Sequence, residues 1–333
     1  MEEKKQPALK TVLISLLISI IVSGIAFGVY YYYDTKTPEV IYKIYDTQID
    51  KEHKDDFPFQ YIIETPKLPK KLDFCGEKVP LYNFDVSERI ERELISNTYW
   101  HSSTLLALKR ANRWFPVIVP ILKKYGIPED FKYLAIVESN LENVASPAHA
   151  VGFWQLLKKT ARHYGLEVNK SVDERYDPWK STEAACKYLL KAKKKFGTWT
   201  LAAVSYNVGM RNLNDQIKRQ RTRVYYNMNL NDETARYLYR LLAIKSIFQN
   251  PAQYGFLVEK SLLYKPLEYT TEKVNRSIKD LAKWANIRGL NYRTLKIYNP
   301  WLRDNYLKVR KRKVYYIKLP TTESINIIPE AGK

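Results

Sequence analysis

The chain has 333 residues, enough to bury a sizeable core in one large domain or two smaller ones. Its 55 Lys and Arg outnumber its 35 Asp and Glu, and the net charge of +20 favours an anionic partner: nucleic acid, a membrane surface or an acidic polymer. Four His and two Cys show no metal-ligand spacing, so we expect neither a metal nor another cofactor.

Residues 11–33 form an uncharged, mostly apolar segment that is long enough to cross a membrane. At about 1.5 Å per residue its 23 positions reach roughly 34 Å, against a hydrocarbon core of about 30 Å. The segment ends in an aromatic belt, Tyr30 to Tyr33. Because three lysines precede it, we expect residues 1–10 to be a cytoplasmic tail and the rest of the chain to be exported.

A cleaved signal peptide is the alternative to this anchor, but the four tyrosines stand where a small-residue cleavage site would lie. Export also makes nucleic acid a poor partner. Residues 34–85 mix Pro, Lys and Asp with little periodicity, which predicts a linker. In an exported protein Cys75 and Cys186 could form one disulfide or remain two free thiols, and the sequence leaves both readings open.

Helical patterns dominate from about residue 86 to residue 255, which predicts a mainly α domain. A helix start is indicated at 86–91. An apolar helical pattern over 103–124 is broken by Pro116 and Pro120.

Pro128 and the two acids after it predict the start of the next helix. Phe131, Leu134 and Glu138 then fall at i, i+3 and i+7. Glu138 is therefore expected on the apolar face of this helix.

Three further helices follow in this domain. Ser181 is expected to cap the first, and Gly197 to end it. One face of that helix is apolar: Ala185, Leu189, Ala192 and Phe196. The others are expected at 199–207, closed by Gly209, and at 232–249.

After residue 256 the pattern changes to short strands and helices. Strands are expected at 267–270 and 314–319, and helices at 277–286 and 292–298. This order predicts a small βααβ module over residues 264–322.

Glu138 is the residue that suggests chemistry. General-acid cleavage of a sugar chain needs a carboxyl that stays protonated near neutral pH, and burial raises a carboxyl pKa because the charged form loses its water. A glutamate at a helix end is more often a solvated or ion-paired surface residue. The motifs around Glu138 favour the catalytic reading.

These motifs occur in order between about residues 125 and 240. They are Glu138-Ser139, Ser146-Pro147-Ala148, Gly152-Phe153-Trp154-Gln155, Val172 to Pro178, Tyr206-Asn207-Val208-Gly209 and Glu233-Thr234-Ala235-Arg236-Tyr237. Any one of them is a weak signal. Together they resemble the catalytic domain of lytic transglycosylases, which are related to goose-type lysozymes, and in particular the membrane-bound D type.

The resemblance implies a lysozyme-like helical domain with a sugar-binding groove, in which Glu138 matches the single catalytic acid/base. In that family the Glu protonates the oxygen between N-acetylmuramic acid and N-acetylglucosamine of peptidoglycan, a β-1,4 bond. It then deprotonates the muramic C6 hydroxyl, which closes onto C1 as a 1,6-anhydro ring. The implied location is the inner membrane, single-pass, with the catalytic domain in the periplasm.

The resemblance also implies substrate-binding residues. These are Ser146, Gln155, Tyr206, Asn207 and Tyr237, the last matching a tyrosine that orients the Glu. Trp154 fits a sugar platform and a core residue equally well. Residues 173–177 are expected to form a structural ion-pair and turn cluster.

His149 stands where the family usually has Gly. If that position needs φ > 0, His costs on the order of 1 kcal/mol there. The C-terminal module resembles a degenerate lysin motif (LysM), which implies binding of N-acetylglucosamine-containing glycans. The basic run at 308–313 fits either an anionic wall polymer or a solvated face.

Two other functions were weighed. A hydrolytic muramidase of the inverting type needs a second carboxylate roughly 6.5–9.5 Å from the first, and Glu142 is the nearest in sequence. A catalytically silent peptidoglycan-binding scaffold would be expected to lack the acid. The expected partners are peptidoglycan strands and the inner membrane, with protein partners unknown.

Overall fold

The computed structural model describes residues 64–321. The expected tail, anchor and most of the linker lie outside these residues. Within 64–321 no helix is long and apolar enough to cross a membrane. Residues 65–321 belong to one compact unit, which holds the helices and strands that the structure describes.

Helices dominate the described chain, which confirms the mainly α prediction. The helices are α3 (Phe84–Tyr99), α4 (His101–Lys124), α5 (Lys132–Ser139), α6 (Lys158–His163), α7 (Pro178–Phe196), α8 (Trp199–Val208), α9 (Met210–Gln220), α10 (Asp232–Gln249), α11 (Leu281–Asn286) and α12 (Tyr292–Tyr298). Short 3-10 helices lie at Glu129–Phe131, Glu174–Tyr176, Tyr225–Asn227, Pro251–Tyr254 and Lys260–Leu262. The strands are β1 (Asp73–Phe74), β2 (Glu77–Lys78), β3 (Tyr269–Val274) and β4 (Tyr315–Pro320).

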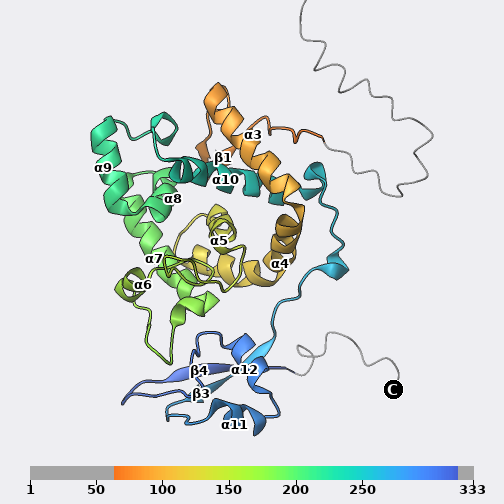
Figure 1. Ribbon diagram of the computed structural model, residues 1–333, viewed down its shortest axis with the longest axis vertical. Helices are drawn as coiled ribbons and strands as arrows, with labels where there is room; N and C mark the ends of the chain where they lie inside the picture. The colour runs from red at the N-terminus through yellow and green to blue at the C-terminus, as the bar shows by residue number, and fades with distance from the viewer. Residues whose placement is uncertain (1–63, 322–333) are drawn as a thin grey trace, which may run out of the picture. The chain divides into compact units, whose positions relative to one another are not determined.

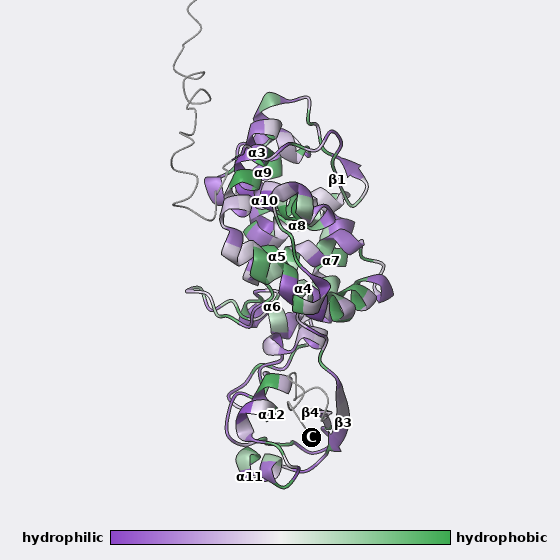
Figure 2. Ribbon diagram, turned by 90° about the vertical axis from the view of Figure 1, so that its right-hand side faces the viewer, coloured by the Kyte–Doolittle hydropathy of each residue, from purple (hydrophilic) through white to green (hydrophobic). Residues whose placement is uncertain are grey.

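The short helix α5 lies at the centre of the helical domain, with α4 and α10 packed against it (Figure 1). Its residues from Tyr133 to Ile136 are all buried, and Figure 2 shows α5 and α8 as largely hydrophobic segments. A helix that is apolar on most sides is enclosed by its neighbours. The last turn of α5, which carries Glu138, is therefore held from several directions.

Helix α4 runs unbroken through Pro116 and Pro120, so the predicted break is wrong. Each proline removes one intrahelical hydrogen bond and frees the carbonyl four residues earlier, on Asn112 and Pro116. Both of these residues are exposed, so water can satisfy the freed carbonyls. Ile118 and its neighbours on the opposite face stay packed in the core.

Helix α7 starts four residues earlier than expected, because Asp177 caps it and Ser181 does not. The Asp177 carboxylate accepts hydrogen bonds from the amides of Trp179 at 2.9 Å and Lys180 at 3.3 Å. Ser181 instead donates its hydroxyl to the Asp177 carbonyl from inside the first turn. The expected apolar face is buried, and Gly197 ends the helix with φ 86°.

The hairpin β1–β2 belongs to the helical domain, so the linker predicted as far as residue 85 is wrong in this part. Phe74 is fully buried and packs edge-on against Phe131, with 5.2 Å between ring centroids. Glu77 accepts hydrogen bonds from the first amides of α8, Trp199 at 2.6 Å and Thr200 at 2.9 Å. The contacts of Glu77 join positions more than 100 residues apart, which no local pattern reveals.

Residues 269–320 form the predicted βααβ module. Strands β3 and β4 pair antiparallel from Tyr269↔Pro320 to Val274↔Tyr315. The module has its own hydrophobic core, around Leu281, Leu295 and Ile317. Helix α11 begins later than expected, because the Asp280 side chain caps it by accepting from the Lys283 amide at 3.0 Å.

Candidate active site

Glu138 is the next-to-last residue of α5, and its carboxyl is held by α10. The Tyr237 hydroxyl donates a hydrogen bond to Glu138 Oε1 over 2.5 Å. Burial raises the pKa of Glu138 from its ordinary 4.5 to about 7, although the Tyr237 hydrogen bond and the charge of Arg240 oppose the rise. A carboxyl whose pKa is raised toward neutral can both give and take a proton near neutral pH.

A pocket of about 660 Å³, here called the catalytic pocket, opens over Glu138. Five side chains that the sequence associated with substrate line it: Ser146, Gln155, Tyr206, Asn207 and Tyr237. Pro147 and Val208 also line the pocket, and burial of the Glu138 carboxyl removes the water that would stabilise its charged form. The structure thus brings these distant segments together, while their contacts with substrate remain a prediction.

Trp154 does not line the catalytic pocket, which corrects its expected role as a sugar platform. Its ring is fully buried, and its Nε1 donates to Thr182 Oγ1 at 2.8 Å. The Trp154 carbonyl accepts the hydroxyl hydrogen of Tyr206 at 2.7 Å. Trp154 is therefore a core residue that positions Tyr206.

The loop of residues 146–157 forms one wall of the pocket and depends on a glycine. Gly152 has φ 80°, and a Cβ at this position would lie 2.0 Å from the carbonyl oxygen of Arg175. Only glycine fits such an approach. The hydroxyl of Ser139, next to Glu138, donates to the Phe153 carbonyl at 2.9 Å and so ties the loop to α5.

The buried guanidinium of Arg175 holds the same loop at both ends. It donates to the carbonyls of His149 at 2.9 Å and Leu156 at 3.0 Å. Asp173, also buried, pairs with it at 2.7 Å. Together with the Asp177 cap, these contacts form the structural ion-pair and turn cluster that the sequence indicates.

Two predicted substrate contacts also shape this loop. The side-chain nitrogen Nε2 of Gln155 donates to the carbonyls of Val144 at 3.1 Å and Gly152 at 2.8 Å. The hydroxyl oxygen of Ser146 accepts from the Ala150 amide at 3.1 Å. Both side chains face the pocket while holding its wall in shape.

Two charged residues in the pocket were given no role by the sequence analysis: Glu233, which it named only as part of a motif, and Arg240. The side-chain nitrogen Nδ2 of Asn207 donates to Glu233 Oε1 at 3.4 Å. The negative charge of Glu233 contributes to the raised pKa of Glu138. Arg240 lies 3.5 Å from the buried carboxylate of Glu93. Acids are common in the first turn of a helix, so Glu233 at the start of α10 carried no separate signal.

Four residues about which the sequence raised questions have clear positions. His149 has φ 60°, the conformation in which His is strained, and its side chain is exposed outside the pocket lining. Glu142 pairs with Arg110 at 2.5 Å and does not line the pocket. Cys75 and Cys186 are free thiols, so no disulfide joins them.

Comparison with known proteins identifies two domains. Residues 117–229 match the family described as the transglycosylase SLT domain. Residues 270–323 match the C-terminal LysM-like domain of soluble lytic transglycosylases. The chain is also 29% identical over 244 residues to the membrane-bound lytic murein transglycosylase D of Escherichia coli K12. That match covers 70% of this chain and 52% of the relative, so the chain spans about half the relative's length.

Two solved structures show weaker similarity. The 70 kDa soluble lytic transglycosylase of Escherichia coli is 21% identical, with a TM-score of 0.35, over 40% of this chain and 24% of that one. The lytic transglycosylase Slt of Pseudomonas aeruginosa is 21% identical, with a TM-score of 0.35, over 45% of this chain and 26% of that one.

The sequence matches confirm the resemblance read from the motifs. The chain is similar to the transglycosylase SLT domain over residues 117–229 and to the LysM-like domain over residues 270–323. Over 70% of its length it is also similar to membrane-bound lytic murein transglycosylase D.

Proposed function

We propose that this chain is a peptidoglycan lytic transglycosylase that cleaves the β-1,4 bond between N-acetylmuramic acid and N-acetylglucosamine, with Glu138 as its single acid/base. The SLT domain supports the reaction class, and the LysM-like domain supports a glycan substrate. The observation that carries the proposal is the carboxyl of Glu138, which lies in a sugar-sized pocket with its pKa raised to about 7.

The Glu138 carboxyl acts twice in the proposed reaction, first as an acid and then as a base. Protonated Glu138 gives its proton to the glycosidic oxygen, and the bond from that oxygen to muramic C1 breaks. The substrate's own acetamido group stabilises the positive charge at C1. Glu138, now a carboxylate, removes the proton of the muramic C6 hydroxyl, whose oxygen bonds to C1. Water is not consumed, and the product carries a 1,6-anhydro ring.

Tyr237, Ser146 and Asn207 support this cycle in the proposal. Tyr237 orients the acid through its hydrogen bond. Ser146 and Asn207 line the pocket and offer polar groups to the acetamido and ring substituents of the sugars. Each of these roles is testable by substitution.

Hydrolysis by the same domain is the second candidate, and one observation favours it. Glu233 is a second carboxylate in the catalytic pocket, where an inverting hydrolase would need a base to activate water. Glu142, the earlier candidate, pairs with Arg110 instead.

The deciding experiment is mass spectrometry of purified sacculi digested with residues 34–333, in parallel with the Glu138→Gln and Glu233→Gln variants. We expect anhydromuropeptides from the wild type and none from Glu138→Gln. Reducing-end products that disappear in both variants would instead identify a muramidase. Sacculi that bind the wild type without releasing products would identify a silent scaffold.

The anchor at residues 11–33 and the periplasmic location complete the proposal. They rest on the sequence and on the membrane-bound name of the relative. Fractionation of cells expressing the full chain should place it with the inner membrane, with residues 64–321 open to protease added to spheroplasts.

A further inference from the structure

A pocket of about 440 Å³ adjoins the catalytic pocket, and we call it the basic pocket. Thr160, Tyr188 and Gly209 line both pockets, so the two form one continuous depression. A molecule bound over Glu138 can therefore extend into the basic pocket without leaving the surface.

A row of aromatic rings runs between the two pockets. Tyr206 lies 5.0 Å from Tyr188, Tyr188 lies 5.8 Å from Tyr164, and Tyr164 lies 4.8 Å from His163, measured between ring centroids. Burial raises the pKa of Tyr188 to about 12, so its hydroxyl stays neutral, and this hydroxyl donates to the Ser205 carbonyl at 2.5 Å. The row thus lines the depression with aromatic side chains.

The charged lining of the basic pocket has one sign. Lys159 of α6, Lys191 of α7 and Arg211 of α9 line it, and no carboxylate does. Within residues 64–321, none of these three cations forms an ion pair. The Lys191 ammonium instead lies 3.4 Å from Nε2 of His163. Three cations facing one depression without a counter-charge leave a site for an anion.

We infer that the basic pocket binds the carboxylates of the stem peptide on the strand being cleaved. This inference rests on the proposed function, because it identifies the substrate as peptide-bearing peptidoglycan. The stem peptide is attached to the muramic residue that the reaction cleaves, and it carries several free carboxylates. Its attachment point at the catalytic pocket places those carboxylates within reach of the basic pocket.

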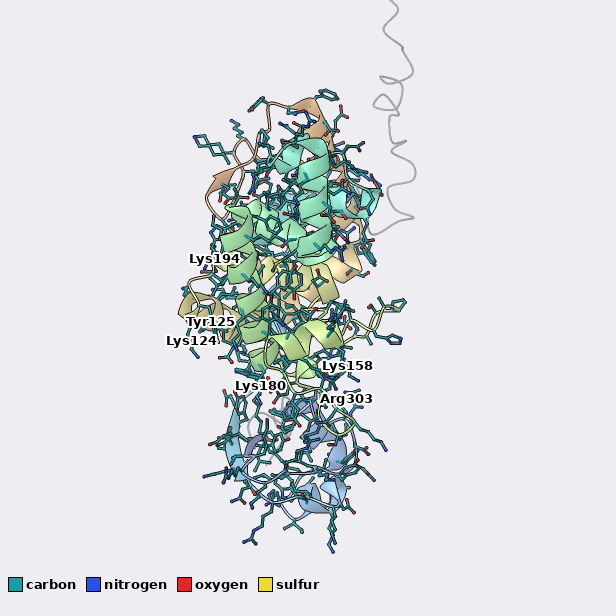
Figure 3. All side chains as sticks on the ribbon, turned by 90° about the vertical axis from the view of Figure 1, so that its left-hand side faces the viewer. Lys124, Tyr125, Lys158, Lys180, Lys194 and Arg303 are labelled. Carbon is teal, nitrogen blue, oxygen red and sulfur yellow. The ribbon has the colours of Figure 1, made fainter. Side chains whose placement is uncertain are left out.

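The test compares two substrates: glycan strands that carry stem peptides and strands from which an amidase has removed them. The variant is Lys191→Gln with Arg211→Gln. The matched control is Lys194→Gln with Lys218→Gln, which removes two charges from the same helices at exposed positions outside both pockets; Figure 3 labels Lys194 on α7. kcat/KM is measured for each protein on each substrate.

We expect the wild type and the control to prefer peptide-bearing strands. The Lys191→Gln, Arg211→Gln variant should lose roughly three- to tenfold on peptide-bearing strands and be unchanged on denuded strands, because partly exposed ion pairs contribute modestly. An equal loss on both substrates, or an unchanged preference, would overturn the inference.

A binding measurement separates this inference from the proposed function. In the Glu138→Gln background, retention of peptide-bearing and denuded strands is compared without cleavage, with free stem peptide as the competitor. Loss of the preference in the Lys191→Gln, Arg211→Gln variant supports the inference even if the wild type cleaves neither substrate. Displacement by an anionic phosphate polymer, but not by free stem peptide, would contradict it.

Discussion

At the scale of single residues, Glu138 meets two opposed requirements. Burial favours the neutral acid, while the hydrogen bond from Tyr237 favours the carboxylate. A pKa of about 7 is the outcome, and it suits a group that must act first as an acid and then as a base.

This balance predicts the effect of Tyr237→Phe. The substitution removes an interaction that lowers the pKa of Glu138, so that pKa should rise above about 7. Because the protonated acid begins the reaction, kcat/KM should fall as pH rises through this pKa, and the alkaline limb should move to higher pH. The maximal rate should fall about tenfold, because the acid is less well oriented.

The pH profile of kcat/KM, measured from pH 5 to 9, checks this prediction. Tyr239→Phe is the control, since Tyr239 lies on the same helix, is equally buried and has no contact with Glu138. A limb that stays in place, or moves to lower pH, in Tyr237→Phe would show that Tyr237 does not tune the acid.

Gly152→Ala should be far more harmful than an ordinary glycine substitution. Its new Cβ would overlap the Arg175 carbonyl oxygen at 2.0 Å, so the pocket wall must shift. We expect a loss of more than about 2 kcal/mol in the free energy of unfolding, together with most of the activity. Gly255, with φ 81° and nothing within 4 Å, is the matched control. Gly255→Ala should cost only about 1 kcal/mol of strain.

Chemical denaturation and turnover measured on both glycine variants separate strain from overlap. Equal losses in Gly152→Ala and Gly255→Ala would mean that the loop adapts and that the close approach is unimportant.

The residue scale also shows what the sequence can predict. Glu138 and the polar residues around it could be found because several short motifs recur in order. Trp154 could not be placed, because an aromatic residue in such a motif packs into the core or faces the pocket according to contacts such as that with Thr182, which is 28 positions away. Glu233 was named in a motif but given no role in the pocket, because acids are ordinary at helix starts.

At the scale of elements, helix α8 depends on a residue that local patterns could not connect to it. The carboxylate of Glu77 accepts from the amides of Trp199 and Thr200, where the helix dipole is positive. Helix α8 carries Tyr206 and Asn207 at its other end. A two-residue strand shows no alternation to read, so the sequence could not separate this hairpin from a linker.

Glu77→Ala should therefore lower the free energy of unfolding by about 1–2 kcal/mol and also reduce activity. The control is Glu88→Ala on α3, an exposed glutamate that forms no ion pair within residues 64–321. Thermal unfolding and sacculus digestion measure the two effects. If Glu77→Ala resembled Glu88→Ala in both, the hairpin would be dispensable to α8.

At the scale of the whole described chain, backbone hydrogen bonds form an interface between the helical domain and the LysM-like module. The amide of Asp173 donates to the Trp301 carbonyl at 2.9 Å, and the amide of Arg303 donates to the Ser171 carbonyl at 2.9 Å. Between them Val172 pairs with Leu302 as an isolated bridge. Val172 is fully buried in the module's core. Its neighbour in sequence, Asp173, forms the ion pair with Arg175 in the helical domain. The helical domain thus completes the module.

Val172→Ala and Val168→Ala test this interface as a matched pair of variants. Both valines are buried in one short segment, but Val168 packs in the core of the helical domain and Val172 in that of the module. Each substitution should cost about 1–2 kcal/mol. Only Val172→Ala should speed hydrogen exchange at the paired amides of β3 and β4, because it opens the module's core. Exchange accelerated by neither variant would mean that the module does not depend on Val172, and equal acceleration by both would mean that the two cores open together.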